Sequence, residues 1–142
     1  MAEELPDPSA NRSLIERLHQ ALLDTRDPDT VDAFFAADFV SHNNPPGFPP
    51  GLAGVKQFFA MFATAFPDAE VAIDDMVAEE DRVAVATTLT GTHEGEVMGI
   101  EPTGRRVSVT GIDLVRIEHG KIAEHRGLTD TVGLMRQLSL PA

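Results

Sequence analysis

Two residues near the end of the chain, Asp113 and His125, have side chains that could carry out acid–base chemistry together. Each lies in a segment where apolar and polar residues alternate, and a short polar stretch separates the segments, so the pattern predicts an antiparallel hairpin. The length of its loop decides which side chains face one another. A two-residue loop at 119–120 places Asp113 opposite Arg126, whereas a three-residue loop at 118–120 places it opposite His125.

An aspartate and a histidine that face one another across two strands lie within hydrogen-bond reach, about 3 Å. Either could then act as general acid or base, contributing on the order of 10²–10⁴ in rate. The three-residue loop groups one face as Val109, Gly111, Asp113, Val115, Ala123, His125 and Gly127, and the other as Ile112, Leu114, Arg116, Ile122, Glu124, Arg126 and Leu128. The alternative to a catalytic role is a structural one. Asp113 would then accept hydrogen bonds from backbone amides or from Arg126, and His125 would pack within its strand.

A stretch rich in proline and glycine, DFVSHNNPPGFPPG at 38–51, predicts a long irregular loop. Loops of this length in compact domains are more often functional than not. His42 or Asn43 could therefore donate a hydrogen bond to a substrate oxygen. His42 could equally hold the loop in place through hydrogen bonds to the main chain.

Further substrate-binding candidates are apolar or small. Phe34, Phe58 and Phe62 recur at helical spacing, which is typical of core residues that also line a pocket. We expect Met98 and Gly127 to line it as well. His42, His93, His125 and Asp113 lack the close spacing of metal-binding motifs, so we predict no metal site.

The elements that would position these residues follow from the hydrophobic period. Helices are predicted at about 9–25, 27–35 and 52–66, and after residue 130. Ser9 or Asn11 should cap the first helix, Asp27 the second and Asp130 the last. Strands are predicted at about 71–73, 83–90, 107–115 and 122–128. Helices followed by an antiparallel sheet indicate an α+β domain, and a curved sheet wrapped over helices encloses a natural pocket for a small molecule.

Composition excludes several classes of partner. The 142 residues carry a net charge of −12, which repels nucleic acid and anionic membrane surfaces, and no apolar run is long enough to span a membrane. The N-terminal segment is acidic and contains Pro6 and Pro8, unlike a signal peptide, so we expect a cytoplasmic protein. There is no cysteine, which excludes disulfides and a thiol nucleophile.

Five motifs point to a family: DFVSHNNPPG, AFPD at 65–68, TGTHEGEVMGIEPTGRRV at 90–107, GIDLVRIEHGKIAEHR, and GLMRQLS. In order and spacing they resemble the SnoaL-like polyketide cyclases and ester cyclases, over about residues 12–139. The resemblance implies the nuclear transport factor 2 fold, with a cone-shaped, curved antiparallel sheet wrapped over N-terminal helices. We expect one such domain over residues 1–142, with residues 1–9 flexible.

The resemblance also implies a reaction. Characterised members close a ring by intramolecular aldol condensation without a cofactor, and an aspartate on the final strand handles the proton. That position is Gly127 in this chain, and the family's second polar residue, a histidine, falls at Asp113. Because both positions must share the pocket face, the resemblance favours the three-residue loop. We therefore expect Asp113 to act as general base or acid, oriented by His125.

The function expected is that of a cofactor-independent cyclase, isomerase or lyase acting on a hydrophobic carbonyl compound. A binding protein without catalysis is one alternative. An epoxide or ester hydrolase is another alternative, since relatives of that kind use a carboxylate–arginine–carboxylate relay. Asp113, Arg126 and Asp130 are residues of the right types, but only the two-residue loop would place Asp113 and Arg126 on one face. The mixed outer face, with Ile112, Leu114, Ile122 and Leu128 among charged residues, predicts a homodimer.

Overall fold

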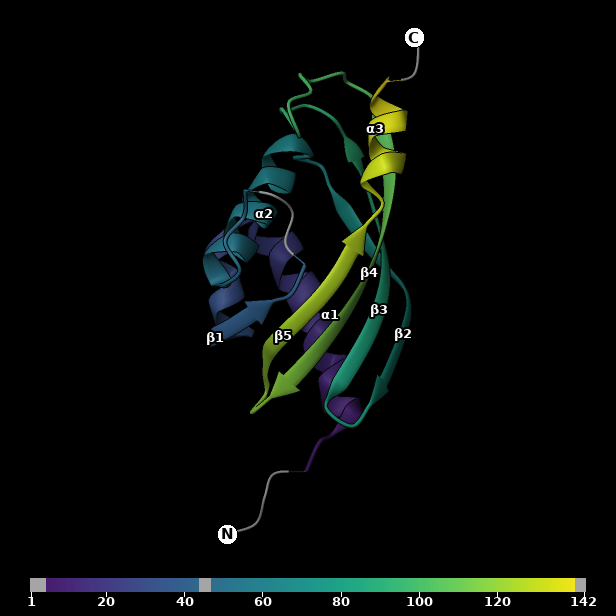
Figure 1. Ribbon diagram of the computed structural model, residues 1–142. Helices are drawn as coiled ribbons and strands as arrows, with labels where there is room; N and C mark the ends of the chain where they lie inside the picture. Colours follow the sequence, from purple (N-terminus) through teal and green to yellow (C-terminus); the bar gives the residue numbers. More distant parts are fainter. Residues whose placement is uncertain (1–4, 44–46, 140–142) are drawn as a thin grey trace.

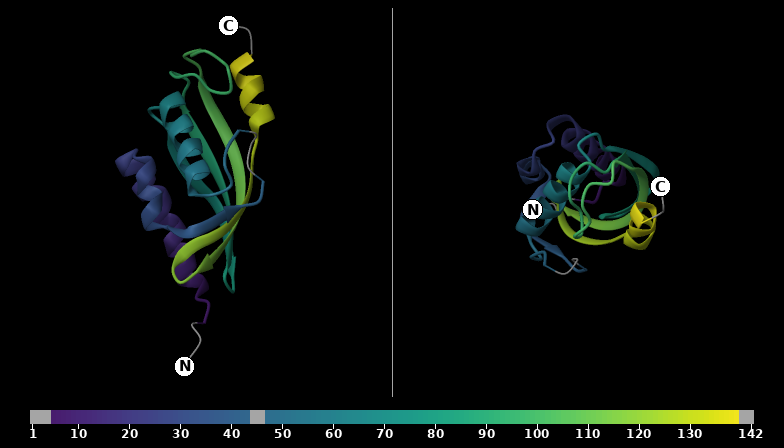
Figure 2. Two further views of the ribbon diagram at one scale, coloured as in Figure 1. Left: turned by 60° about the vertical axis from the view of Figure 1, so that its left-hand side comes forward. Right: turned by 90° about the horizontal axis from the view of Figure 1, so that it is seen from above.

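The computed structural model describes residues 5–43 and 47–139. Their elements are α1 (Pro8–Thr25), the 3-10 helix η1 (Pro28–Ala33), β1 (Phe35–Ser41), α2 (Leu52–Ala65), β2 (Glu70–Glu79), β3 (Arg82–Thr92), β4 (Arg106–Glu118), β5 (Lys121–Thr129) and α3 (Thr131–Ser139) (Figure 1). In this part of the chain the strands form one sheet in the order β1-β5-β4-β3-β2, and the sheet curves around the helices (Figure 2). The expected α+β architecture is confirmed. We call the face that packs on the helices the inner face and the opposite one the outer face.

The first helix begins earlier than the sequence predicted. Its cap is Asp7, whose side chain accepts a backbone hydrogen bond from the first turn, and Pro8 takes the first helical position. Proline suits this position because its fixed φ is already helical and its missing N–H would have no partner there. Ser9 and Asn11 therefore lie inside the helix, and residues 8–9, expected to be flexible, are helical. Residues 1–4 of that expected flexible segment lie outside the described residues.

The second predicted helix is a short 3-10 turn, and a strand follows it where the sequence predicted helix and loop. Asp27 caps the turn as expected, but the turn ends at Ala33 and β1 occupies Phe35–Ser41. This strand pairs in parallel with β5, with Ser41 opposite His125. Backbone pairing with a strand distant in sequence fixes this segment, which a local pattern does not reveal. Residues 44–46 of the predicted loop lie outside the described residues.

The loop between β4 and β5 has two residues. His119 and Gly120 both have positive φ, 51° and 71°, as a type I′ turn requires, and Glu118 pairs with Lys121 across the turn. This is the shorter of the two loops considered from the sequence. Taken alone, it would place Asp113 opposite Arg126.

A bulge at Ala123 changes that register. The pairing of β4 with β5 passes over Ala123, and beyond it Asp113 lies opposite Gly127 rather than opposite His125 or the arginine at 126. Both predicted registers are therefore wrong in detail. Since the side-chain period of a strand is two, the one-residue shift returns Asp113, His125 and Gly127 to one face. Ile122, expected on the outer face, lies between the turn and the bulge, where it pairs with Ile117 and points into the core with 1% exposure.

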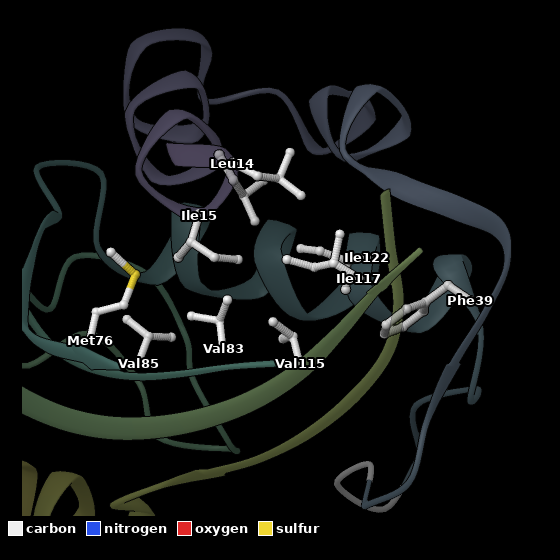
Figure 3. Packing of buried hydrophobic residues seen from close by; sticks show 10 residues of the cluster. Leu14, Ile15, Phe39, Met76, Val83, Val85, Val115, Ile117 and Ile122 are labelled. Atoms are coloured by element: carbon white, nitrogen blue, oxygen red, sulfur yellow. The ribbon is translucent and has the colours of Figure 1, made fainter. Parts of the chain in front are cut away.

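Two apolar clusters fill the space between the sheet and the helices. The first consists of Leu14, Ile15, Leu18, Phe39, Met76, Val83, Val85, Val115, Ile117 and Ile122 (Figure 3). The second consists of Phe62, Ala65, Phe66, Ala69, Val97, Val107, Val109, Leu134 and Leu138. On β4, Asp113 lies between Val109 of the second cluster and Val115 of the first. The polar pair of interest is thus held between two packed cores.

No helix in the described ranges is long and apolar enough to cross a membrane.

Candidate active site

Asp113 and His125 contact each other on the inner face. His125 Nε2 lies 2.7 Å from Asp113 Oδ1. The two are diagonal neighbours, since Gly127 is directly opposite Asp113, and the length of the imidazole ring spans the extra distance. The Asp113 side chain is 35% exposed and that of His125 29%, so solvent reaches both. Asp113 Oδ2 accepts no hydrogen bond from any residue in the described part of the chain. The pair therefore has a free carboxylate oxygen that a substrate could approach.

Ser41 is a third member of this group that the sequence interpretation missed. Its Oγ lies 3.3 Å from His125 Nδ1, and the residue is only 8% exposed. If Nε2 of His125 carries the proton, Nε2 donates to the Asp113 carboxylate and Nδ1 accepts from the Ser41 hydroxyl. If Nδ1 carries the proton instead, Nδ1 donates to the Ser41 hydroxyl. Both ring nitrogens thus have a partner. Alternation within FVSH could have placed Phe39 and Ser41 on the inner face, had the strand been recognised.

His42 and Asn43, the predicted hydrogen-bond donors to substrate, have protein partners on β5. His42 Nε2 lies 2.5 Å from Glu124 Oε2, so its side chain bonds a carboxylate rather than the main chain. Gly127 N donates to Asn43 Oδ1 at 3.0 Å, and Asn43 Nδ2 donates to Gly127 O. The backbone N of His42 also donates to His125 O at 3.0 Å. The segment following β1 therefore fixes the β5 backbone around His125 and Gly127.

Glu124 is the centre of a charged network on the outer face. Arg116 Nε donates to Glu124 Oε1 at 2.6 Å, and Arg116 Nη1 also donates to Glu118 Oε2 at 3.1 Å. Hydrogen bonds from Arg116 and then from His42 hold the pKa of Glu124 down at about 2. His42 thus belongs to a network on the face opposite the Asp113–His125 pair.

The predicted lining residues lie mainly in the core. Phe62 is 8% exposed in the second cluster, Phe58 packs on it with ring centroids 4.8 Å apart, and Phe34 packs against the first cluster. Phe39, which the sequence interpretation did not select, has its ring centroid 6.3 Å from that of His125. Met98 is 41% exposed in the turn between β3 and β4, where its φ is +48°. A lining role for these side chains stays a prediction.

The relay expected for a hydrolase is not assembled. Arg126 pairs with Leu114 on the outer face, on the side of the sheet away from Asp113. Asp130 caps α3 instead, with Oδ1 accepting a hydrogen bond of 2.8 Å from Gly133 N. The bulge at Ala123 is the reason, because it gives Arg126 the same facing direction that the three-residue loop would have given it.

A hollow of about 610 Å³ lies on the outer side of the sheet. Its apolar lining includes Ala86, Ile112, Leu114 and Leu128, with Arg126 and Asn43 beside them. Ile112 and Leu128 are 63% and 76% exposed. This hollow faces away from the Asp113–His125 pair and is a property of the outer face.

Comparison with known proteins gives the family of this chain. The model of the SnoaL-like polyketide cyclase family matches residues 13–138. The chain belongs to the SnoaL-like polyketide cyclase family. The family and the fold expected from the sequence are therefore confirmed.

Relatives of this SnoaL-like chain include named cyclases. It is 33% identical over 143 residues to aklanonic acid methyl ester cyclase DnrD of Streptomyces peucetius, covering 94% of this chain and 93% of that protein. It is 33% identical over 118 residues to nogalonic acid methyl ester cyclase of Streptomyces nogalater, covering 80% and 86%. The structure of TsrD from Streptomyces laurentii is similar, with a TM-score of 0.81, 30% identity, and 94% and 97% coverage. These relatives agree with the expected cyclase function and do not favour the binding-protein or hydrolase alternatives.

Gly127 is the position at which the family resemblance places the acidic residue. Here Gly127 lies directly beneath the Asp113–His125 hydrogen bond, and a Cβ at this position would lie 2.1 Å from Asp113 Oδ1. The carboxylate of this SnoaL-like chain therefore reaches the histidine from β4, across the strand pair, rather than from β5.

Proposed function

We propose that this chain is a cofactor-independent cyclase that closes a ring in a polyketide by intramolecular aldol condensation. The observation that carries the proposal is the 2.7 Å contact between Asp113 and His125, two acid–base groups that are each about one-third exposed between apolar clusters. By analogy with the relatives named above, the substrate class is a hydrophobic polyketide methyl ester with several carbonyl groups.

In the proposed reaction, Asp113 acts first as a base. Its free Oδ2 takes a proton from a carbon that lies between two carbonyl groups, and the resulting enolate carbon attacks a second carbonyl of the same molecule. One carbon–carbon bond forms, and the carbonyl oxygen becomes an alkoxide. The protonated pair then returns the proton to that oxygen. The product is an isomer of the substrate, so the reaction balances without an oxidant, a reductant or a leaving group.

His125 has two parts in this scheme. Its Nε2–H donates to Asp113 Oδ1, which orients the carboxylate so that Oδ2 faces the substrate. The same Nε2–H stabilises the negative charge that returns to the carboxylate once the proton has left for the product. The buried ring of Phe39, with its centroid 6.3 Å from that of His125, packs beside the imidazole from the core side.

The proposal is tested by turnover with the methyl esters of aklanonic and nogalonic acid. Substrate and product are separated by chromatography, and the reaction in D₂O reports exchange at the acidic carbon. Asp113→Asn should lower kcat by on the order of 10² or more, because an amide cannot accept the proton. Asp38→Asn, at an exposed carboxylate on β1, is the matched control and should leave kcat unchanged. Wild-type kcat in Asp113→Asn would refute the proposed base.

We also propose that two copies associate through the outer face. Ile112, Leu128 and Val77 are 63%, 76% and 62% exposed there, and apolar side chains gathered on one face typically mark an interaction site. Charged groups around them, Arg126 and the Arg116–Glu124 network, give a polar rim of both signs that a twofold contact can match with itself.

Sedimentation equilibrium tests this association. The wild-type chain should sediment as a dimer, and the double variant Ile112→Glu with Leu128→Glu should sediment as a monomer because it buries like charges at the contact. Val132→Glu, at a position on α3 that is 67% exposed, serves as the control and should remain dimeric. A monomeric wild-type chain at micromolar concentration would exclude the proposed interface.

A further inference from the structure

We infer that Gly127 is a positioning residue of this site: the hydrogen bond between Asp113 and His125 forms because position 127 carries no side chain. The catalytic consequence rests on the proposed function, whereas the effect on the pair rests on geometry alone. Nothing in the residue type signals this role, since glycine has no group that takes part in acid–base chemistry.

The space above Gly127 is occupied by the hydrogen bond itself. An ideal Cβ at this position would lie 2.1 Å from Asp113 Oδ1, 2.6 Å from His125 Nε2 and 2.8 Å from His125 Cε1. All three separations are far below van der Waals contact, and two of the three atoms are the acceptor and the ring nitrogen of the bond. Even a methyl group at 127 therefore requires Asp113 and His125 to move apart.

The backbone at Gly127 cannot retreat to make room. Its N donates to Asn43 Oδ1 and its O accepts from Asn43 Nδ2, while Asp113 is its direct partner in the strand pairing. Gly127 is thus held on one side by Asn43, in the segment that follows β1, and on the other by β4. A new side chain must displace the ends of Asp113 and His125, because these are the flexible groups that it meets.

An alanine at this position should nevertheless fold. Gly127 is not among the glycines with positive φ, so its backbone conformation suits an ordinary residue. The atoms that the methyl group meets are the ends of two side chains that are about one-third exposed and can rotate toward solvent. Gly127→Ala therefore breaks the pair while sparing the core, which separates positioning from folding.

Gly111 offers a matched control on the neighbouring strand. A Cβ there would lie 3.4 Å from Leu128 O and 3.8 Å from each of two threonine hydroxyls, which is ordinary contact. Gly111→Ala makes the same change in the same sheet, two residues from Asp113, without touching the hydrogen bond. It controls for the general effect of replacing a strand glycine.

The first readout does not depend on the substrate. In ¹⁵N-histidine-labelled protein, the ring signals of His125 report its protonated nitrogen and its hydrogen bonding. Gly127→Ala and Asp113→Ala should both shift these signals away from those of the wild type, whereas Gly111→Ala should keep the wild-type signals. Wild-type His125 signals in folded Gly127→Ala would overturn the inference even if the wild-type enzyme turned over no tested ester.

The second readout is a double-mutant cycle on kcat with the polyketide methyl esters. Gly127→Ala should lower kcat by on the order of 10², with KM changed less than about threefold, since the pair and not general binding is lost. In the Asp113→Ala background the same substitution should cost nothing further, because no carboxylate remains to displace. Equal losses in both backgrounds would show that Gly127 does not act through Asp113. Absence of turnover by the wild type would count against the proposed function, and the ring signals would still decide the inference.

Discussion

Replacing Ser41 with alanine should reduce catalysis modestly while leaving the fold intact. The Ser41 hydroxyl lies 3.3 Å from His125 Nδ1, which is long for a hydrogen bond, and such a bond contributes a net ~0.5–1.5 kcal/mol. The ring is 29% exposed, so water can replace the hydroxyl and no full burial penalty applies. Since about 1.4 kcal/mol corresponds to a factor of ten in rate, kcat should fall by about 2- to 12-fold.

The loss should appear in kcat rather than in KM. Ser41 is 8% exposed and contacts the ring nitrogen away from Asp113, so it orients the histidine without meeting the substrate. Ser41→Thr is the matched variant, because it keeps the hydroxyl and suits a strand. Steady-state kinetics of both variants with the same methyl ester, alongside thermal melts, provide the measurement.

Two outcomes would refute this reasoning. If Ser41→Ala has the kcat of the wild type, the hydroxyl does not orient His125 in the reactive state. If Ser41→Thr is as impaired as Ser41→Ala while both melt like the wild type, the loss comes from packing around β1 and not from the hydroxyl.

Two further predictions concern stability. Glu124→Gln should lower the free energy of unfolding at pH 7. Contacts with Arg116 and His42 depress the pKa of Glu124 from 4.5 to about 2. The difference in free energy from the wild type should therefore persist above about pH 4.5 and shrink as the pH falls toward 2. Urea unfolding at pH 7 and 3 tests this, and a difference that grows on acidification would contradict it. Phe66→Ala removes a side chain that is 0% exposed in the second cluster and should lower the free energy of unfolding by about 3–5 kcal/mol. Val132→Ala, at a position that is 67% exposed, should lower it by less than about 0.5 kcal/mol. Equal urea midpoints for the two variants would contradict the packing assignment.

Much of the fold could be predicted because its signals are local. The helical spacing of Leu14, Ile15 and Leu18 predicted α1, and all three are buried in the structure. Alternation predicted the strands that became β3, β4 and β5. The strand β1 was missed because its seven residues give a weak pattern beside a proline-rich stretch, and its parallel pairing with β5 joins segments more than 80 residues apart.

The candidate site was predicted in part for the same reason. Period-two alternation placed His125 and Gly127 on one face of their strand, and the family resemblance placed Asp113 on that face with them. The structure brings Asp113 and His125 into contact, through a two-residue turn and a bulge rather than through the expected three-residue loop. Alternation was not enough to identify Ser41, whose contact with His125 depends on the unrecognised strand β1. The direction of His42, toward Glu124 on the outer face, depends on the same strand.

The sequence by itself determined the chemistry available to this protein: its family, its α+β class and an aspartate and histidine on one sheet face. Residue type, hydrophobic period and the resemblance of five motifs to a known family carry this information, since all three are read directly from the order of residues in the chain. Only the tertiary structure decided that a two-residue turn and a bulge at Ala123 together set Asp113 opposite Gly127. A bulge leaves no clear pattern in the sequence. The space above Gly127 is filled by the Asp113 side chain from β4 and the His125 side chain from β5, and only their packing shows how they meet. The distance between Asp113 and His125, and the need for Gly127 beneath them, are therefore properties of the packed sheet.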